Sequence, residues 1–390
     1  MTASEPKPSK PNFLDLDGDG KVDIHDFLSL FKTGKTESSG VPAVSDRVAE
    51  VWGRRGKDLD QLSVTIRDKV NSNRPLAKKS GFSTSDIRMN KILKRLQLDF
   101  NDKNLETLRG AYIDCLEKTK EIEEELSDLV ARSSLADERE RTKIEIRIGK
   151  LKELLGKMHG ERERFLSDFV THFSVYGVQI SEDQAEVLLS RIDSGDVTRM
   201  TSAFAIVSGL TAQFAHAKQA SGESTSTAQK YYAMYIGLLE LQELIQSEYI
   251  KKMDKQYLPG VFEIKRTAEQ LIAETQVLMK NMPIEHLGSY EQNLQSQEFT
   301  LEVASLYEDA LLNDRSRALK AREIVRNLLR LAENTLKTVK VAADLVSLMK
   351  DSRGLYDEVM QLQTPSLAPF ENLELRKEFQ AVTDRLRTLS

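Results

Sequence analysis

Five aspartates lie within twelve positions near the start of the chain, in the stretch DLDGDGKVDIHDF from Asp15 to Phe27. Counted from Asp15, carboxylates stand at positions 1, 3, 5, 9 and 12, and a glycine stands at position 6. Ca²⁺ takes six to eight oxygen ligands, and oxygen donors at this spacing around a sharp turn are typical of a calcium loop. The stretch therefore predicts a metal site built from Asp15, Asp17, Asp19, the Lys21 carbonyl, Asp23 and Asp26.

This stretch resembles an EF-hand calcium loop and, more closely, its dockerin-type version, because D-x-D-G-D-G-K-V precedes an exiting helix and Val22 supplies the apolar position 8. Pro6, Pro8 and Pro11 interrupt any entering helix. The resemblance implies one bound Ca²⁺. Asp26 is one methylene shorter than the usual glutamate, which favours weaker Ca²⁺ binding or a smaller shell that Mg²⁺ can share. Such loops usually occur in pairs, but the chain has no second D-x-D-x-D-G, and the alternative is an acidic surface loop without metal.

The elements that must carry this loop are predicted to be helices. Of 390 residues, 30% are charged and only 6% aromatic, with nine prolines and nineteen glycines, so the chain has few turns. We expect an all-α protein, an elongated antiparallel bundle of long coiled-coil helices with a small N-terminal calcium loop. The expected order is a disordered tail at 1–12, the calcium loop and exiting helix at 13–34, a linker at 35–45, a helix and linker at 46–82, and the bundle at 83–390.

Heptad patterns predict how the long helices pack. Three predicted helices each carry an apolar stripe with steps of three and four. The first is a single helix over about 104–173, the second spans about 227–282 with a local kink at Pro259 and Gly260, and the third lies towards the C-terminus. We expect the first stripe to pack on the second. The three predicted stripes are Ile144, Ile148, Leu151, Leu155, Met158 and Phe165; Tyr257, Val261, Ile264, Ala268, Leu271, Thr275 and Leu278; and Ile324, Leu328, Leu331, Thr335, Thr338, Ala342, Leu345 and Met349.

Ser181 followed by Gln184 predicts a capping box at the start of a shorter helix between the first two stripes. The eighteen uncharged residues at 200–217 predict a buried helix. The alternative is a segment that a pore-forming protein conceals until it meets a membrane, although its Ser, Thr, Gln and His make it too polar to span a bilayer alone.

Other chemistry has little support. KTGKT at 32–36 lacks the first glycine of a P-loop, since position 29 is Ser29, and the five histidines lack metal-ligand spacing. No catalytic motif is evident, so we do not expect an enzyme. The net charge of −5 gives no global attraction for nucleic acid, and one cysteine, Cys115, fits a reducing compartment. With neither a signal peptide nor a long apolar stretch, the expected location is the cytoplasm.

Segments over 165–390, among them ISEDQAEVLLSRIDSGDVTRMTSAF and KYYAMYIGLLELQ, are similar to a group of uncharacterised bacterial all-helical proteins, some labelled as chromosome-partitioning factors. The resemblance implies a bacterial cytoplasmic origin, while partition ATPases need the P-loop that this chain lacks. The sequence therefore predicts a non-enzymatic, calcium-binding helical scaffold that binds a protein partner or itself. Membrane activity through residues 200–217 is the alternative.

Overall fold

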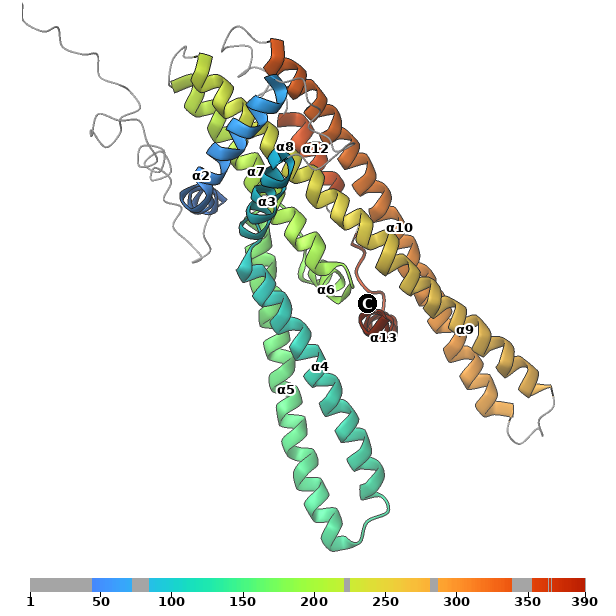
Figure 1. Cartoon of the computed structure of the whole chain (residues 1–390). Coiled ribbons are helices and arrows are strands. Elements are labelled where there is room, and N and C mark those ends of the chain that lie inside the picture. The colour runs from blue at the N-terminus through green and yellow to red at the C-terminus, as the bar shows by residue number, and fades with distance from the viewer. Residues whose placement is uncertain are drawn as a thin grey trace, which may run out of the picture. The chain divides into compact units, whose positions relative to one another are not determined.

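The computed structural model describes residues 44–71, 84–220, 225–280, 287–338, 353–363, 365 and 367–389. Regular structure in these ranges is helical throughout, without a strand, which confirms the all-α class (Figure 1). The chain divides into two compact units, and α7 (Ser194–Ala220), α8 (Thr225–Lys252) and α10 (Leu287–Thr338) contribute residues to both.

The first unit contains the described residues within 44–101, 200–247 and 319–362. It contains α2 (Val44–Asn71), α3 (Thr84–Asp99), most of α12 (Arg353–Gln363) and parts of the three shared helices. Trp52 of α2 packs edge-on against Phe214 of α7 with ring centroids 5.6 Å apart. The side chains from Met200 to Val207 are all buried, as expected for a helix inside a core.

The second unit contains 102–199, 248–318 and 363–390. Its complete elements are α4 (Lys103–Ser133), α5 (Glu138–Ser174), α6 (Glu182–Ser190), the π-helix η1 (Met253–Tyr257), α9 (Leu258–Met279) and α13 (Leu373–Leu389). The predicted capping box is confirmed, because Ser181 and Gln184 exchange both hydrogen bonds at the start of α6.

The single long helix predicted over 104–173 is wrong, since this segment forms the antiparallel hairpin of α4 and α5 (Figure 1). The chain reverses at 134–137, and Asp137 caps α5 by accepting a hydrogen bond from the Glu140 amide at 2.9 Å. Ile144 and Leu151 are buried as predicted, but they pack on α4 rather than on the helix at 227–282. The nearest helix along the chain supplies the apolar surface that this stripe needs.

The second predicted helix is largely confirmed. It consists of α8, η1 and α9, and the π-helix lies directly before Pro259, where the local distortion was expected. The helix α9 runs antiparallel to α10. Lys265 forms an ion pair with Glu308 at 2.6 Å, and Thr275 donates a hydrogen bond to Gln297 at 3.0 Å. The stripe is buried except at Leu271 and Leu278, whose exposed fractions are 44% and 46%.

The third predicted stripe is rotated. Within α10, Leu331 is 47% exposed, and Ile324 and Thr335 are only half-buried, although Leu328 is buried. The core-facing residues are Ala321, Val325, Leu328, Leu329, Ala332 and Leu336. Apolar residues stand on both sides of the true stripe, so counting in heptads alone selected a neighbouring row. Residues 339–349 of that prediction lie outside the described ranges.

Candidate functional site

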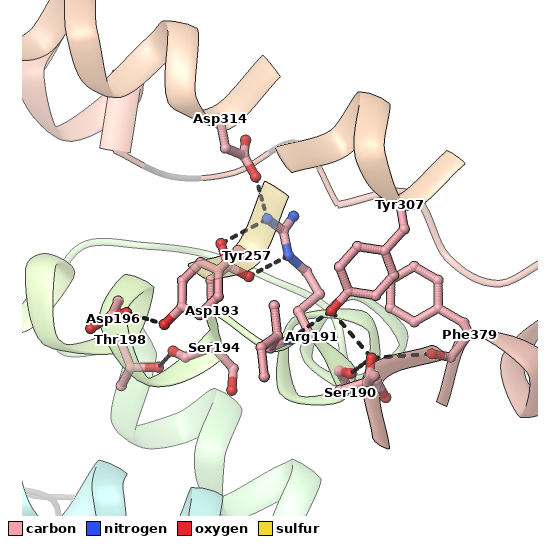
Figure 2. A network of polar contacts seen from close by, with 12 residues as sticks. Ser190, Arg191, Asp193, Ser194, Asp196, Thr198, Tyr257, Tyr307, Asp314 and Phe379 are labelled. Atoms are coloured by element: carbon pink, nitrogen blue, oxygen red, sulfur yellow. Dashed lines mark hydrogen bonds and ion pairs between the residues drawn. The ribbon is translucent and has the colours of Figure 1, made fainter. Parts of the chain in front are cut away.

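A buried polar network surrounds the short connection between α6 and α7 in the second unit (Figure 2). The helix α6 ends at Ser190, and Arg191 takes an extended conformation with φ −85° and ψ 152°. Backbone amides of Asp196 and Val197 then donate to the Asp193 carbonyl at 2.9 and 3.0 Å. This break between two helices turns the side chains of Arg191 and Asp193 into the core.

Arg191 forms the centre of the network. Its Nε and Nη2 donate to the two carboxylate oxygens of Asp193 at 2.8 and 2.9 Å, and Nη2 also donates to Asp314 of α10 at 2.5 Å. The exposed fractions of these three side chains are 3%, 0% and 7%. A buried bidentate pair of this kind is strong and directional, because charge-assisted hydrogen bonds hold both partners in one plane.

Tyrosine hydroxyls and one lysine complete the shell of the aspartates. Tyr249 of α8 donates to Asp193 at 2.8 Å. Tyr257 of η1 and Lys252 both donate to Asp196, each at 2.6 Å. Asp193 and Asp196 lie at the start of α7, where carboxylates are also favoured by the helix dipole. The network therefore joins the start of α7 to α8, η1 and α10.

A second branch reaches α13. The Tyr307 hydroxyl accepts a hydrogen bond from the Ile192 amide at 2.6 Å and lies 3.2 Å from the Thr383 hydroxyl. Thr383 Oγ1 donates to the Ser190 carbonyl at 2.8 Å, and the ring of Tyr307 stacks on Phe379 with centroids 4.4 Å apart. These contacts hold the C-terminal helix on the α6–α7 connection (Figure 2).

The pKa values follow from burial and from the excess of negative charge. Burial opposes the charged form of Arg191, but Asp193 and Asp314 raise its pKa well above the ordinary value. Burial raises the pKa of Asp314, Arg191 opposes this shift, and Asp193 adds to it. Burial likewise raises the pKa of Tyr307 to about 12. Tyr249 is shifted in the same direction by burial and by Asp193.

The arrangement can neutralise charge and fix helices. Each carboxylate of the network has donors from the protein itself, and the central ion pair is closed off from solvent. Within the described ranges, no three or more His, Cys, Asp and Glu side chains are grouped so that they could hold a metal ion. No described helix combines the length and the apolar character that crossing a membrane requires.

A polar hollow of about 690 Å³ lies elsewhere in the same unit, between α5, α6 and Arg376 of α13. Glu186 pairs there with Arg376 at 3.1 Å and with Arg162 at 3.9 Å. Arg162 and Arg376 thus share the Glu186 carboxylate, and Arg164 of the lining pairs with Asp168 at 3.7 Å, so the three arginines do not form an open anion site.

The residues predicted to bind metal, Asp15, Asp17, Asp19, Lys21, Asp23 and Asp26, lie outside the described residues. The network residues were assigned no role from the sequence. A weak signal was available, because Arg191 and Asp193 fall at a break between two apolar helices, and Asp314 continues the core row of Tyr307 and Leu311. Their pairing across 123 residues has no local signature.

Comparisons of the chain with protein-family models, with curated proteins and with solved structures found no match. The resemblance of residues 15–26 to EF-hand and dockerin loops therefore stays a prediction from the residues themselves.

Proposed function

We propose that this chain is a non-enzymatic helical scaffold or interaction protein whose N-terminal loop binds one Ca²⁺. The observation that carries the calcium site is the spacing of its donors, because every ligand position of the loop has an oxygen and the turn position has Gly20. The proposed ligands are Asp15, Asp17, Asp19, the Lys21 carbonyl, Asp23 and Asp26.

Support for a scaffold comes from the contacts of the buried charged side chains, which bind one another and connect helices. Arg191, Asp193 and Asp314 form their hydrogen bonds with one another and with Tyr249, and they connect helices that are far apart in the sequence. A general acid or base must reach a proton on its substrate, within about 3 Å or through one water. Asp193 has no exposed surface, so its chemistry is that of a structural counterion.

Calcium would have a structural effect in this proposal. Metal binding would order the loop and fix Val22, Phe27 and Phe31 on one side of it. One loop with one helix buries little apolar surface alone, so it needs a second surface for stability. That surface is either the helical part of this chain or a protein partner.

Calorimetric titration of the full chain with Ca²⁺ tests the proposal. We expect saturable heat for one site, and we expect Asp15→Asn/Asp19→Asn to abolish it because two central ligands lose their charge. Competition with Mg²⁺ measures the selectivity that Asp26 sets.

The matched control is Glu117→Gln/Glu121→Gln/Glu124→Gln, which removes three carboxylates from the exposed face of α4. This variant should bind Ca²⁺ as the wild type does. The calcium proposal is refuted if the wild type shows no saturable heat at millimolar Ca²⁺, or if the control variant loses the site and the loop variant keeps it.

A further inference from the structure

The outer side of α3 carries cations and exposed apolar side chains, and is here called the α3 face. Ile87, Lys91, Lys94 and Leu98 follow one another at steps of four and three, so they form one row along the helix, and Arg88 lies beside this row. Ile87 and Leu98 are 53% and 73% exposed, and the three cations are exposed as well. The row lies opposite the side of α3 that packs into the core. That side consists of Met89, Ile92, Leu93, Leu96 and Phe100.

The carboxylates of α3 are already used in its packing. Its two acids are Asp86 and Asp99, one near each end of the helix. Asp86 pairs with Lys69 of α2, and Asp99 pairs with Arg55 of α2. These contacts hold α3 against α2 and leave none of its carboxylates for the α3 face.

The cations of the α3 face are therefore left without a counterion. Arg88, Lys91 and Lys94 form no ion pair within the described ranges. No acid stands three or four residues before or after any of them, so their own helix provides no partner either. Like charges at steps of three destabilise a helix, so this row favours an anionic partner on its outer side.

An acidic segment of this chain precedes α2 and lies outside the described residues. Residues 13–34 contain five aspartates and two lysines, hence a net charge of −3 with histidine neutral. The aspartates come first, within 15–26, and Phe27 and Phe31 follow them. The segment thus combines negative charge for the cations of the α3 face with apolar surface for its two exposed apolar side chains.

The attachment of this segment to α2 brings it within reach of α3. Arg47, in the first turn of α2, donates from Nη2 to the Asn101 carbonyl at 2.9 Å, so the C-terminal end of α3 lies beside the start of α2. Residues 35–43 span up to about 30 Å when extended. The row from Ile87 to Leu98 is only about 16 Å long, from a rise of about 1.5 Å per residue. The whole α3 face is therefore accessible to the acidic segment.

The order of residues along the two segments agrees. Going away from the start of α2, the chain presents Phe31 and Phe27 first and the aspartates afterwards. Going away from the same end, α3 presents Leu98 first and then Lys94 and Lys91. A single direction of docking therefore places apolar side chains against each other and carboxylates against ammonium groups.

We propose that residues 13–34 bind the α3 face of the same chain, with their aspartates against its lysines and their phenylalanines against Leu98. Exposed ion pairs are individually weak. The short connection provides an effective concentration in the millimolar range, however, so weak contacts suffice for an intramolecular complex. An anionic membrane or a nucleic acid would have to displace this segment, and the net charge of −5 provides no overall attraction for either.

This inference names the second surface that the proposed function requires for the N-terminal segment. It rests on that proposed role, but it uses only the charges and the apolar residues of the segment and not a bound metal. All measurements are therefore made with a calcium chelator, so a failure of calcium binding and a failure of this inference are separate results.

Double electron–electron resonance of the full chain tests the proposal. Nitroxide labels are attached to Ser29→Cys and Lys57→Cys in a Cys115→Ser background. Lys57 is exposed on α2, and Ser29 lies on the opposite side of the expected exiting helix from Phe27 and Phe31, so neither label blocks the contact. We expect a narrow distance distribution at about 0.02 M salt and a broad one at about 0.5 M salt, because exposed charges are then screened.

Charge reversal identifies the two partners. Lys91→Glu/Lys94→Glu should lower the equilibrium constant for docking at least about tenfold and broaden the distribution at low salt, because like charges then face each other. Asp17→Lys/Asp19→Lys should have the same effect. All four changes together should restore the narrow distribution, and circular dichroism should show every variant folded.

The matched control is Lys150→Glu/Lys152→Glu, which changes the net charge by the same amount as the α3 variant at exposed positions of α5. It should dock as the wild type does. An excess of unlabelled chain should leave the distribution unchanged, because the contact forms within one chain.

A broad distribution for the wild type at low salt, a control variant that broadens, or a fourfold variant without recovery overturns the proposal. It is also overturned if unlabelled chain removes the narrow distance, since the segment then binds a second copy. A third contradiction would be a narrow distribution for Lys91→Glu/Lys94→Glu together with a loss of binding to phosphatidylserine vesicles, since the α3 face would then serve a membrane.

Discussion

Replacing Arg191 with methionine would leave the buried carboxylates of Asp193 and Asp314 without the guanidinium that both of them bind. Arg191 provides both hydrogen bonds to Asp193 and one to Asp314, and its side chain is only 3% exposed. Methionine keeps much of the length and volume, so the change removes charge and hydrogen bonds rather than packing.

The expected cost follows from two independent estimates. Removing one partner of a buried ion pair typically costs about 3–5 kcal/mol, because the remaining charge is uncompensated. Alternatively, the variant can protonate one of the two carboxylates. From an ordinary pKa near 3.8 this costs about 4 kcal/mol at about pH 7, at about 1.4 kcal/mol per pH unit. We therefore expect a loss of about 3–5 kcal/mol in the free energy of unfolding.

The second estimate also predicts the pH dependence. In the variant, at least one carboxylate has a folded-state pKa raised above its unfolded value, so the native state binds more protons than the unfolded state. The stability of the variant relative to wild type should then recover as the pH falls from about 7 towards 5, by about 1.4 kcal/mol per unit for one proton.

Urea denaturation followed by far-ultraviolet circular dichroism measures this loss, with an unchanged dependence on urea as the check that the unfolding reaction is the same. The control is Arg147→Met, which removes an arginine that is 54% exposed from its pair with Glu125 and should cost less than about 1 kcal/mol. Adding Asp193→Asn and Asp314→Asn to the Arg191 variant should restore most of the loss. A loss of under about 1 kcal/mol for Arg191→Met at pH 7 would refute this account of the network.

Three further predictions concern single sites. Asp314 has a raised pKa, so its contribution to stability is complete below its ordinary pKa of 3.8 and is lost as the pH rises through the raised pKa. The difference in unfolding free energy between wild type and Asp314→Asn should therefore shrink across that pH window. A difference that is constant with pH would contradict this. A Cβ at Gly237 would lie 2.5 Å from Leu62 Cδ2, so Gly237→Ala should lower the free energy of unfolding by about 1–3 kcal/mol in urea denaturation. Gly149→Ala, on the open side of α5, should instead raise it by about 0.5–1 kcal/mol. Equal effects of the two substitutions would show that the close contact at Gly237 is absent. Cys115 is buried and burial raises its pKa, so an aromatic disulfide reagent should label it far more slowly in the native chain than in urea, and similar rates would contradict its burial.

Local patterns in the sequence were sufficient to predict the helices themselves. Ser181 and Gln184 predict a cap whose two hydrogen bonds lie within four residues, and the structure contains both. Ile144 and Leu151 are buried as their spacing predicts, because an amphipathic helix must bury its apolar stripe, whichever helix packs against it. The α2 helix at Val44–Asn71 likewise matches the helix expected over 46–70.

Turns without glycine or proline were the main source of error. The reversal at 134–137 uses SLAD, in which only Asp137 has a strong positional role, so the heptad pattern seemed to continue through it. The partner of the α5 stripe was wrong for the same reason, since a hairpin brings α4 beside α5 only if the chain reverses there.

The sequence by itself determined the helical class, most helix limits and the apolar faces, because each depends on residues within a few turns of one another. It also specified the donor spacing of residues 15–26. Only the tertiary structure decided which helices pair and that Arg191 meets Asp314 across 123 residues. Such pairings depend on the path of the chain between distant residues, which no local spacing encodes.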